Sequence, residues 1–525
     1  MLVNIFGAKC IGIDAVPVTV EVDVVPGIGI HLVGLADAAV RESLLRTITA
    51  LQSLDFRIPG RKIVINLAPA DIHKNGSGFD VAIALGIIAA SGQKEFPSLE
   101  KYLIMGELGL DGTVRNVSGA LPIVELAIKQ GFKGCILPLE SALEALEFRQ
   151  IPIYGVRNLP EVIRILSEEE DCTDLLVWNS EAVADFPEQS GPLQAGDRMD
   201  FSEIIGQDMA KRGAEIACSG GHNVIMVGPM GAGKTSLAKA MAGILPPMTM
   251  EEAITTSKIY SVAGTGSMRY GLIRTRPFRD PHYSASLPAI IGGGGGDSIL
   301  PGEVSLAENG ILFLDEFCLA PKSVMEALRG PIEDRQVVIS RLRSKVRFPS
   351  SFMLVAATNP CPCGYWGEGD RCTCTPGQRA SYLSRLSGPL IDRIDLQIWM
   401  HPIDSKRLIS RAKGETSAEV SKRVKAAREV QKARFEGSGI TTNAEMNNRQ
   451  LEEFCTLSEE CKDFLEKLIT SSGMSARAYG RIVKLARTIA DMETVRLGKS
   501  IPVEISVNHL SEASSYRFLD RRPEL

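Results

Sequence analysis

The chain has 525 residues, of which 44% are hydrophobic and 23% are charged, and its formal net charge is -5. This composition is typical of a folded globular protein of roughly two to four domains, and it excludes a protein that binds nucleic acid through a basic surface overall. The sequence shows no apolar run of about 20 residues that could span a membrane and no secretory signal, so we expect a cytoplasmic protein.

Residues 1–165 alternate β-rich and helical segments, a pattern typical of an α/β domain. We expect strands in 16–25, 62–68, 101–108 and 134–138, and a helix in 37–54. Residues 166–199 are acidic and carry Pro, Gly and Ser without a sustained period. They are predicted to form an exposed linker.

A second α/β pattern occupies residues 200–402, with strand candidates at 222–228, 310–316 and 351–359. Residues 403–525 are mostly helical and highly charged, with helices expected in 417–435 and 475–497. We therefore predict an α/β protein with a parallel-sheet core and a C-terminal helical lid.

A phosphate-binding loop is predicted between the strand at 222–228 and the helix that follows. Residues 228–235 match GxxxxGK[ST] in the strand–loop–helix context that this motif requires. Glycines let successive backbone amides face the phosphates of ATP at the positive end of the helix, and Lys234 neutralises the outer phosphates. The predicted nucleotide-binding residues are Gly228, Pro229, Met230, Gly231, Ala232, Gly233, Lys234, Thr235 and Ser236.

Two acidic residues end the apolar strand at 310–316 and suit hydrolysis. Thr235 is predicted to ligate Mg²⁺ through its hydroxyl, and Asp315 is predicted to hold the ion through the ligand shell around the metal. Glu316 is placed to orient and polarise the attacking water, as a general base must. The sequence thus predicts a hydrolytic nucleotide site.

Four further polar residues resemble functional positions of AAA+ ATPases. Asn359, at the end of the strand at 351–359, resembles sensor 1, and Gln207 resembles the adenine-side segment that precedes the phosphate loop. Arg393 resembles the arginine finger that reaches the γ-phosphate of a neighbouring subunit, which implies a ring. Arg477 resembles sensor 2, which comes from the lid onto the same nucleotide. Without this resemblance, each arginine is better interpreted as a solvated helix charge.

Four cysteines follow Asn359 closely, in the pattern CxC, eight residues, CxC. They are Cys361, Cys363, Cys372 and Cys374. Four thiolates suit tetrahedral zinc, although the tight CxC spacing leaves an iron–sulfur cluster or a redox pair as alternatives. Tyr365 and Trp366 between the pairs are predicted either to contact a partner or a base, or to pack over the metal loop.

Basic residues recur at every second position between the acidic strand and Asn359. They are Arg341, Arg343, Lys345 and Arg347. On a strand they would share one face. In AAA+ rings of the similar branch a hairpin before sensor 1 points into the central pore, so these residues are candidates for contact with DNA phosphates. The alternative is a solvated edge strand, where basic side chains discourage aggregation.

Three segments resemble the YifB/ComM family of magnesium-chelatase-like AAA+ proteins: RPFRDPHYSASLPAIIGGGGGDSILPGEVSLAENGILFLDE, EALRGPIEDRQVVISR and AATNPCPCGY. The resemblance covers nearly the whole chain. It implies a Lon-protease-like N-terminal domain, an ATPase core and a C-terminal helical domain, assembled as a homo-hexamer. It also implies ATP-driven branch migration on single-stranded or branched DNA in recombination and natural transformation. This chain has Met230 where the family usually has proline, and Glu308 where it has histidine.

The first domain resembles Lon protease in HKNGSGFDVAIALG and GELGLDGTVRNVSGALP. Proteolysis by such a domain requires a Ser–Lys dyad. Leu121 falls where the protease has its lysine, and Gly78 or Ser77 falls where it has its serine. We therefore expect no proteolysis, and a role in oligomerisation or in positioning DNA.

Two other functions share the core motifs. One is the ATPase subunit of a magnesium chelatase, and the other is a protein-remodelling AAA+ ATPase that does not act on DNA. A DNA motor should hydrolyse ATP faster when DNA is present, and neither of these alternatives should. The dependence of the ATPase rate on DNA therefore distinguishes them.

Overall fold

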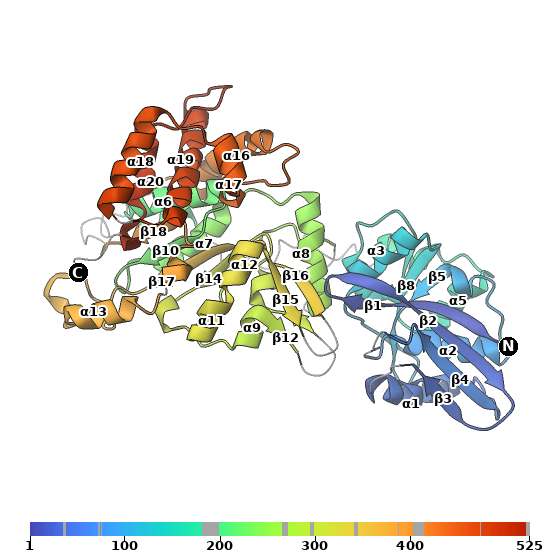
Figure 1. Cartoon of the computed structure of the whole chain (residues 1–525). Helices are drawn as coiled ribbons and strands as arrows, with labels where there is room; N and C mark the ends of the chain where they lie inside the picture. The colour runs from blue at the N-terminus through green and yellow to red at the C-terminus, as the bar shows by residue number, and fades with distance from the viewer. Residues whose placement is uncertain are drawn as a thin grey trace.

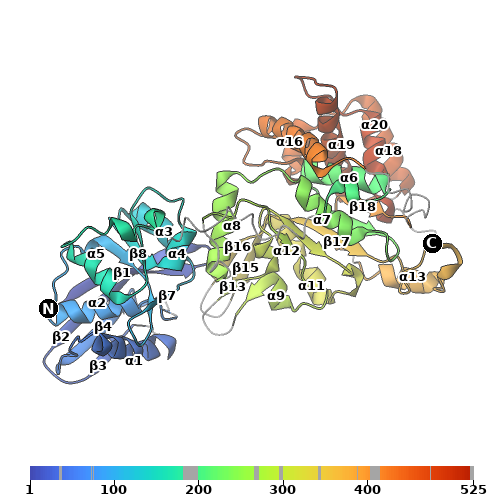
Figure 2. The ribbon, with the colours of Figure 1, turned by 180° about the vertical axis from the view of Figure 1, so that it is seen from behind.

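The computed structural model describes residues 1–34, 38–71, 74, 76–180, 199–264, 271–294, 299–340, 345–386, 388–402, 414–472 and 474–520. Figure 1 shows an N-terminal domain at one end, a central domain, and a group of C-terminal helices packed on the central domain away from the first. The view from behind shows the same order (Figure 2).

The N-terminal domain is a mixed seven-stranded sheet in the order β3-β4-β2-β1-β5-β8-β9. Its strands are β1 Val3–Ile11, β2 Asp14–Val25, β3 Ile30–Val33, β4 Lys62–Ala68, β5 Tyr102–Ile104, β8 Gly134–Pro138 and β9 Ile153–Val156, with a separate pair β6 Glu107–Leu108 and β7 Val114–Arg115. Its helices are α1 Ala38–Ser53, α2 Asp80–Ala90, α3 Ala120–Gln130, α4 Leu139–Glu144 and α5 Leu159–Ser167. The strands and the helix expected in this region are confirmed, and the segment 101–108 divides between β5 and β6.

This sheet contains strands with one buried face and strands that are buried on both faces, and the residues of each strand explain the difference. In β4 every second residue is buried, which is the period-two pattern of a strand with one face in the core. All five residues of β8 are buried, because this strand lies between β5 and β9 in the parallel part of the sheet.

The hydrophobic core of this domain extends beyond residue 165. The turns η2 (Thr173–Leu175) and η3 (Val177–Asn179) bury Leu175 and Val177 against it. The predicted linker 166–199 therefore begins too early, because the apolar residues within the acidic segment pack on the domain. Residues 181–198 lie outside the described part of the chain.

The central domain is built on a five-stranded parallel sheet in the order β11-β14-β17-β10-β18. Its strands are β10 Val224–Val227, β11 Phe278–Arg279, β14 Ile311–Leu314, β17 Met353–Thr358 and β18 Leu396–Trp399. Every residue of β10, β14 and β17 is buried, as expected for parallel strands covered on both faces. The three strands predicted here are confirmed, and the sheet is consistent with an AAA+ fold.

Helices and short strands complete this domain. The helices are α6 Asp208–Gly220, α7 Lys234–Ile244, α8 Met250–Ala263, α9 Leu287–Ile291, α10 Glu303–Leu306, α11 Lys322–Ala327, α12 Arg329–Asp334, α13 Pro376–Leu383 and α14 Gly388–Ile391. The short strands form two hairpins, β12 Gly292–Gly293 with β13 Leu300–Pro301, and β15 Gln336–Ser340 with β16 Lys345–Pro349.

The C-terminal region is helical, as predicted. Its helices are α16 Ser417–Arg434, α17 Asn448–Phe454, α18 Glu459–Ser472, α19 Ala476–Arg496 and α20 Val507–Ser515. Thr416 and Glu419 cap α16 reciprocally, which fixes where this helix begins. Among the described helices, none combines the length and apolarity needed to cross a bilayer.

Helix α8 joins the first two domains. Lys258, although largely buried, forms ion pairs with Asp14 at 3.0 Å and Glu125 at 2.7 Å. One turn later the Ser261 hydroxyl donates to the Glu144 carboxylate at 2.5 Å. Burial raises the pKa of Glu144 to about 7. The N-terminal domain is therefore held against the core by polar contacts as well as by packing.

Candidate nucleotide-binding site

The phosphate-binding loop lies at the carboxyl end of β10 and leads directly into α7. Gly233 has a φ of +87°, a conformation that favours glycine, at the point where the loop turns into the helix. A Cβ on Gly228 would lie 2.6 Å from the carbonyl oxygen of Met400, so no side chain fits there. These two glycines allow the loop to place its backbone amides at the amino end of α7, where they can bind phosphate.

Lys234 is held in place by oxygens from the loop and from a neighbouring strand. Its Nζ donates to the carbonyl oxygens of Gly228 at 2.7 Å and Pro229 at 2.9 Å, and to Oδ1 of Asn359 at 3.0 Å. Burial lowers the pKa of this ammonium, and the nearby carboxylates oppose that shift. Phosphate oxygens that enter the loop would replace these contacts with stronger, charge-assisted ones.

The predicted magnesium residues face each other. Thr235 Oγ1 donates to Asp315 Oδ2 at 3.0 Å, and the other carboxylate oxygen, Oδ1, accepts the backbone N–H of Glu316 at 2.8 Å. A hydroxyl and a carboxylate in this arrangement fit Mg²⁺ bound to phosphates. Glu316 has a φ of +48°, unusual for a residue other than glycine, and strain of this kind is common at functional sites.

Strand order explains why these residues meet. β10, β14 and β17 are parallel neighbours, so the segments after their carboxyl ends lie at the same edge of the sheet. The loop follows β10, Asp315 follows β14, and Asn359 follows β17. The structure therefore brings together the predicted phosphate, magnesium, general-base and sensor 1 residues.

Gln207 supports the loop from the side. Its side-chain Nε2 donates to the carbonyl oxygens of Ala232 at 3.1 Å and His401 at 2.6 Å. Gln207 thus ties the phosphate loop to the segment after β18.

The two predicted arginines lie elsewhere. Arg393 pairs with Glu333 at 2.7 Å and is two residues from Asp395, which directly precedes β18. Arg481, one turn after Arg477 on α19, pairs with the same Asp395 at 2.7 Å. β18 is parallel to β10, and the phosphate loop follows the carboxyl end of β10. Arg393 and Arg481 therefore lie at the opposite, amino ends of the strands, and Arg477 is one helical turn from Arg481. The structure does not bring Arg393 or Arg477 to the nucleotide loop of their own chain.

The four cysteines converge after the sensor strand. Their sulfur atoms all lie within 4.8 Å of one another, and the Sγ atoms of Cys361 and Cys363 are 3.3 Å apart. Four sulfurs at this separation are compatible with a tetrahedral metal ion. The guanidinium of Arg371, in the same loop, lies over the Tyr365 ring, and that of Arg379 on α13 lies over the Trp366 ring.

Only part of the basic segment falls in the described residues. Lys345 and Arg347 are exposed on β16, while Val346 and Phe348 between them are buried. Residues 341–344, with Arg341 and Arg343, lie outside the described part of the chain. Ser340 of β15 pairs with Lys345 of β16. In the described part of this segment, Lys345 and Arg347 share the exposed face of β16.

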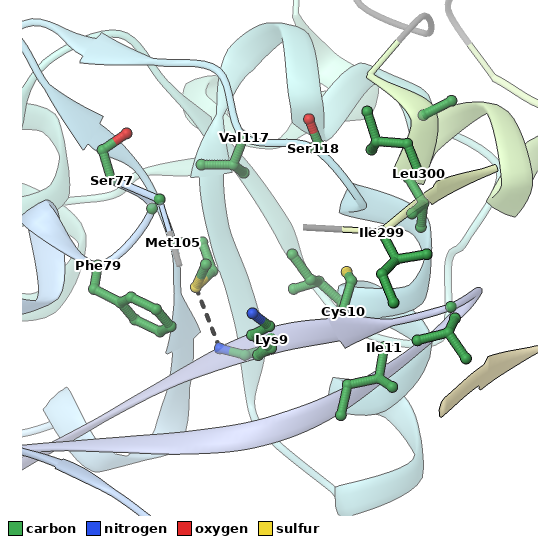
Figure 3. Close-up of a pocket in the computed structure, with 18 of the residues that line it drawn as sticks. Lys9, Cys10, Ile11, Ser77, Phe79, Met105, Val117, Ser118, Ile299 and Leu300 are labelled. Atoms are coloured by element: carbon green, nitrogen blue, oxygen red, sulfur yellow. Dashed lines mark hydrogen bonds between the residues drawn. The ribbon is translucent and has the colours of Figure 1, made fainter. Parts of the chain in front are cut away.

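A pocket of about 720 Å³ lies between the N-terminal domain and the core, around the segment that resembles the Lon protease site (Figure 3). Ser77 in this pocket donates to the carboxylate of Glu107. Leu121, expected from the sequence at the position of the protease lysine, is buried. The nearest lysine in the sequence, Lys74, donates instead to the carbonyl of Pro69. Lys9 of β1 also lines this pocket, together with Ser77 and Ser118.

Two features near the site were not predicted from the sequence. Gly364, in the turn of the first cysteine pair, accepts a hydrogen bond from the backbone N–H of Met230 at 3.2 Å. Trp399 at the end of β18 packs edge-on against Trp366 of the cysteine loop, with ring centroids 5.2 Å apart. Gly364, which follows Cys-Pro-Cys, is a sequence signal for a tight turn. The sequence carries no signal that this turn contacts Met230 of the phosphate loop.

Comparison with known proteins covers nearly the whole chain. Residues 200–408 match the family described as magnesium chelatase, subunit ChlI, residues 20–141 match subunit ChlI of Mg-chelatase, and residues 414–517 match the ChlI C-terminal family. The chain is 39% identical to the protein YifB of Salmonella typhimurium over 514 residues, covering 97% of this chain and 96% of that protein.

Two other relatives bear on the domains. Competence protein ComM of Haemophilus influenzae is 38% identical over 522 residues, covering 99% of this chain and 98% of that protein. An archaeal Lon protease of Methanocaldococcus jannaschii is 26% identical over 136 residues, covering 26% of this chain and 21% of that protein.

Proposed function

Because the chain belongs to the YifB/ComM family of magnesium-chelatase-like AAA+ proteins, which implies an ATPase that uses ATP and Mg²⁺, we propose that it is a cytoplasmic, ring-forming DNA motor. In this proposal ATP hydrolysis drives branch migration on single-stranded or branched DNA in recombination and natural transformation. The observation that carries the proposal is the full-length similarity to a competence protein.

The residues of the nucleotide site have separate roles in this proposal. The loop amides and Lys234 bind the phosphates, and Thr235 and Asp315 hold Mg²⁺, which supplies charge stabilisation as the phosphoryl group is transferred. Glu316 accepts the proton of the attacking water, and Asn359 orients that water or the γ-phosphate.

A ring is supported by the position of the arginines. Arg393 lies away from the phosphate loop of its own chain, and phosphoryl transfer in this class gains from an arginine beside the γ-phosphate. A neighbouring subunit can supply that arginine, and Arg477 on the same side can serve a neighbour in the same way. We propose a homo-hexamer for this reason and from the family resemblance.

Lys345 and Arg347 are proposed to contact DNA. They project from the hairpin that leads into the sensor strand β17, and basic side chains bind phosphates without regard to sequence. The hairpin leads into β17, and Asn359 follows that strand, so the position of the hairpin can respond to the nucleotide. Arg341 and Arg343 remain candidates from the sequence.

The ATPase rate with and without DNA tests the motor. We expect single-stranded DNA and a four-way junction to raise the rate of the wild type, and Lys345→Ala with Arg347→Ala to remove most of this increase. The matched control removes two exposed lysines of α16, Lys425→Ala with Lys432→Ala, and should keep it. A rate that DNA does not change would instead favour a protein-remodelling ATPase or a chelatase-type subunit.

The four cysteines are proposed to hold zinc. Metal analysis of the purified protein should find one zinc per chain, and Cys361→Ser should lose it. Iron together with visible absorbance would assign an iron–sulfur cluster instead.

The N-terminal domain is proposed to be Lon-like in fold and to act in oligomerisation or in positioning DNA. The hydrogen bond from Ser77 to Glu107 and the buried Leu121, expected at the position of the protease lysine, support a non-proteolytic role. Cleavage of fluorescent casein in the presence of ATP would contradict it.

A further inference from the structure

The cysteine loop is in direct backbone contact with the tip of the phosphate loop. The N–H of Met230 donates to the carbonyl oxygen of Gly364 at 3.2 Å. Gly364 has a φ of +80°, and a Cβ added to it would lie 2.9 Å from both Cγ and Sδ of Met230. The two loops therefore meet closely, at a position that favours glycine for its backbone and for its lack of a side chain.

The same glycine belongs to the turn that carries the first cysteine pair. Its N–H donates to the carbonyl oxygen of Cys361 at 3.0 Å, which closes the turn around Cys363. A metal ion bound by both sulfurs would fix this turn, since the Sγ atoms are 3.3 Å apart. The position of the Gly364 carbonyl is thus set by the residues that would bind the metal.

A second contact joins the phosphate loop to Asn359, which directly precedes the cysteine loop in the chain. Asn359 is two residues before Cys361, and its Oδ1 accepts a hydrogen bond from Lys234 Nζ at 3.0 Å. The segment 359–364 therefore contacts the phosphate loop at two positions, Lys234 through Asn359 and Met230 through Gly364.

Aromatic packing makes a third contact, from the far end of the cysteine loop. Arg379 donates to the carbonyl oxygen of Cys374 at 3.1 Å, and its guanidinium lies 5.2 Å from the ring centre of Trp366. Trp366 packs against Trp399, which pairs in register with Val227, the residue before the phosphate loop.

We propose that the four-cysteine centre is a metal site that positions the phosphate loop, so that metal occupancy sets the affinity for ATP. A loop that binds phosphate through its backbone amides gains affinity when it is held in the bound conformation beforehand. Metal loss frees Gly364 and Asn359, and the loop must then be ordered by the nucleotide itself. The inference rests on the proposed zinc site and on ATP binding, and it does not depend on DNA.

Nucleotide binding by the full chain, measured with a fluorescent ATP analogue, tests this proposal. The protein is compared as purified, after zinc is stripped and the chelator removed, and after zinc is added back. We expect the metal-free protein to bind roughly tenfold more weakly, as for the loss of about one hydrogen bond with its packing, and added zinc to restore binding. Cys363→Ser should bind as weakly as the stripped protein, and Cys172→Ser, outside the cluster, should bind normally.

A variant that keeps all four cysteines separates the effect of the metal site on the position of the phosphate loop from its effect on folding of the cysteine loop. Gly364→Ala should retain one zinc per chain and still weaken nucleotide binding, because its Cβ displaces Met230. Adding Met230→Ala should recover part of the affinity by removing that collision. In a Trp178→Phe background the remaining tryptophans, Trp366 and Trp399, report on the loop, and their emission should change on metal loss and recover with zinc.

Equal affinity in the zinc-loaded and metal-free proteins, or normal affinity in zinc-loaded Gly364→Ala, would overturn the inference. Failure of both forms to bind nucleotide would instead contradict the proposed ATPase, so the two failures are distinguishable.

Discussion

The Lys234 ammonium lies 3.0 Å from Oδ1 of Asn359, although the two residues are 125 positions apart in the chain. This contact joins the phosphate loop after β10 to the end of β17, the strand beside it. A nucleotide that binds the lysine must alter the surroundings of the asparagine. Binding and the positioning of the catalytic water are therefore coupled through one side chain.

Lys234→Ala is expected to weaken ATP binding by roughly ten- to a hundredfold, because a charge-assisted hydrogen bond to phosphate is lost. Equilibrium titration with a fluorescent ATP analogue measures the change. Lys239→Ala, on the same helix α7, is the matched control and should bind as the wild type does. Unchanged binding in Lys234→Ala would show that the nucleotide does not occupy this loop.

Glu316→Gln is expected to keep ATP binding and to lower the turnover rate by roughly a hundredfold or more, because the amide cannot accept the proton of the attacking water. Phosphate release and nucleotide binding are measured on the same preparation. Glu326→Gln, on an exposed position of α11, should leave both unchanged. Normal turnover in Glu316→Gln would show that another residue is the general base.

Arg393→Ala and Lys234→Ala are expected to be inactive separately and to regain activity when mixed. In a mixed ring, an intact loop from the Arg393→Ala subunit can meet an intact arginine from the Lys234→Ala subunit. ATP turnover across mixing ratios measures this complementation. The double variant mixed with Arg393→Ala should regain nothing, and the absence of any recovery in the main mixture would argue against an arginine that acts between subunits.

Lys345→Ala with Arg347→Ala is expected to make single-stranded DNA binding less dependent on salt. Each phosphate contact to a single strand contributes about 0.7 to the slope of log affinity against log salt, so the slope should fall by about 1.4. Binding at several salt concentrations measures it. An unchanged slope would mean that these two side chains are exposed to solvent and do not contact DNA phosphates.

Glu144→Gln is expected to alter how the free energy of unfolding depends on pH. Burial raises the pKa of Glu144 to about 7 in the folded protein, so the folded state holds its proton more tightly than the unfolded state. Stability from this group is present below its unfolded pKa and is lost as the pH rises to about 7, by roughly 3 kcal/mol at most.

Thermal unfolding at pH 5.5 and pH 8 measures this effect. The wild type should lose more stability between these values than Glu144→Gln, which keeps an acceptor for Ser261 without a buried charge. Burial also raises the pKa of Glu308 to about 7, but that group is present in both proteins and does not affect their difference. Glu100→Gln, at an exposed site, should behave as the wild type, and equal slopes in wild type and Glu144→Gln would contradict the prediction.

The sequence by itself determined the local parts of the site. The motif at 228–235 needed only a strand before it and a helix after it, and both are present. Asp315 and Asn359 follow apolar segments that read as buried strands, and parallel strands place their following residues at one edge. The spacing of the cysteines was enough to suggest that they meet.

Only the tertiary structure decided how distant segments are placed. Arg393 and Arg477 carry no local signal of which end of the sheet they occupy, and that depends on the direction of β18 and the docking of α19. The first domain reaches past residue 165 because Leu175 and Val177 are buried against it. The contact of Met230 with Gly364 arises because β17 lies beside β10, and strand order is set by packing of the whole sheet, which no local pattern of residues encodes.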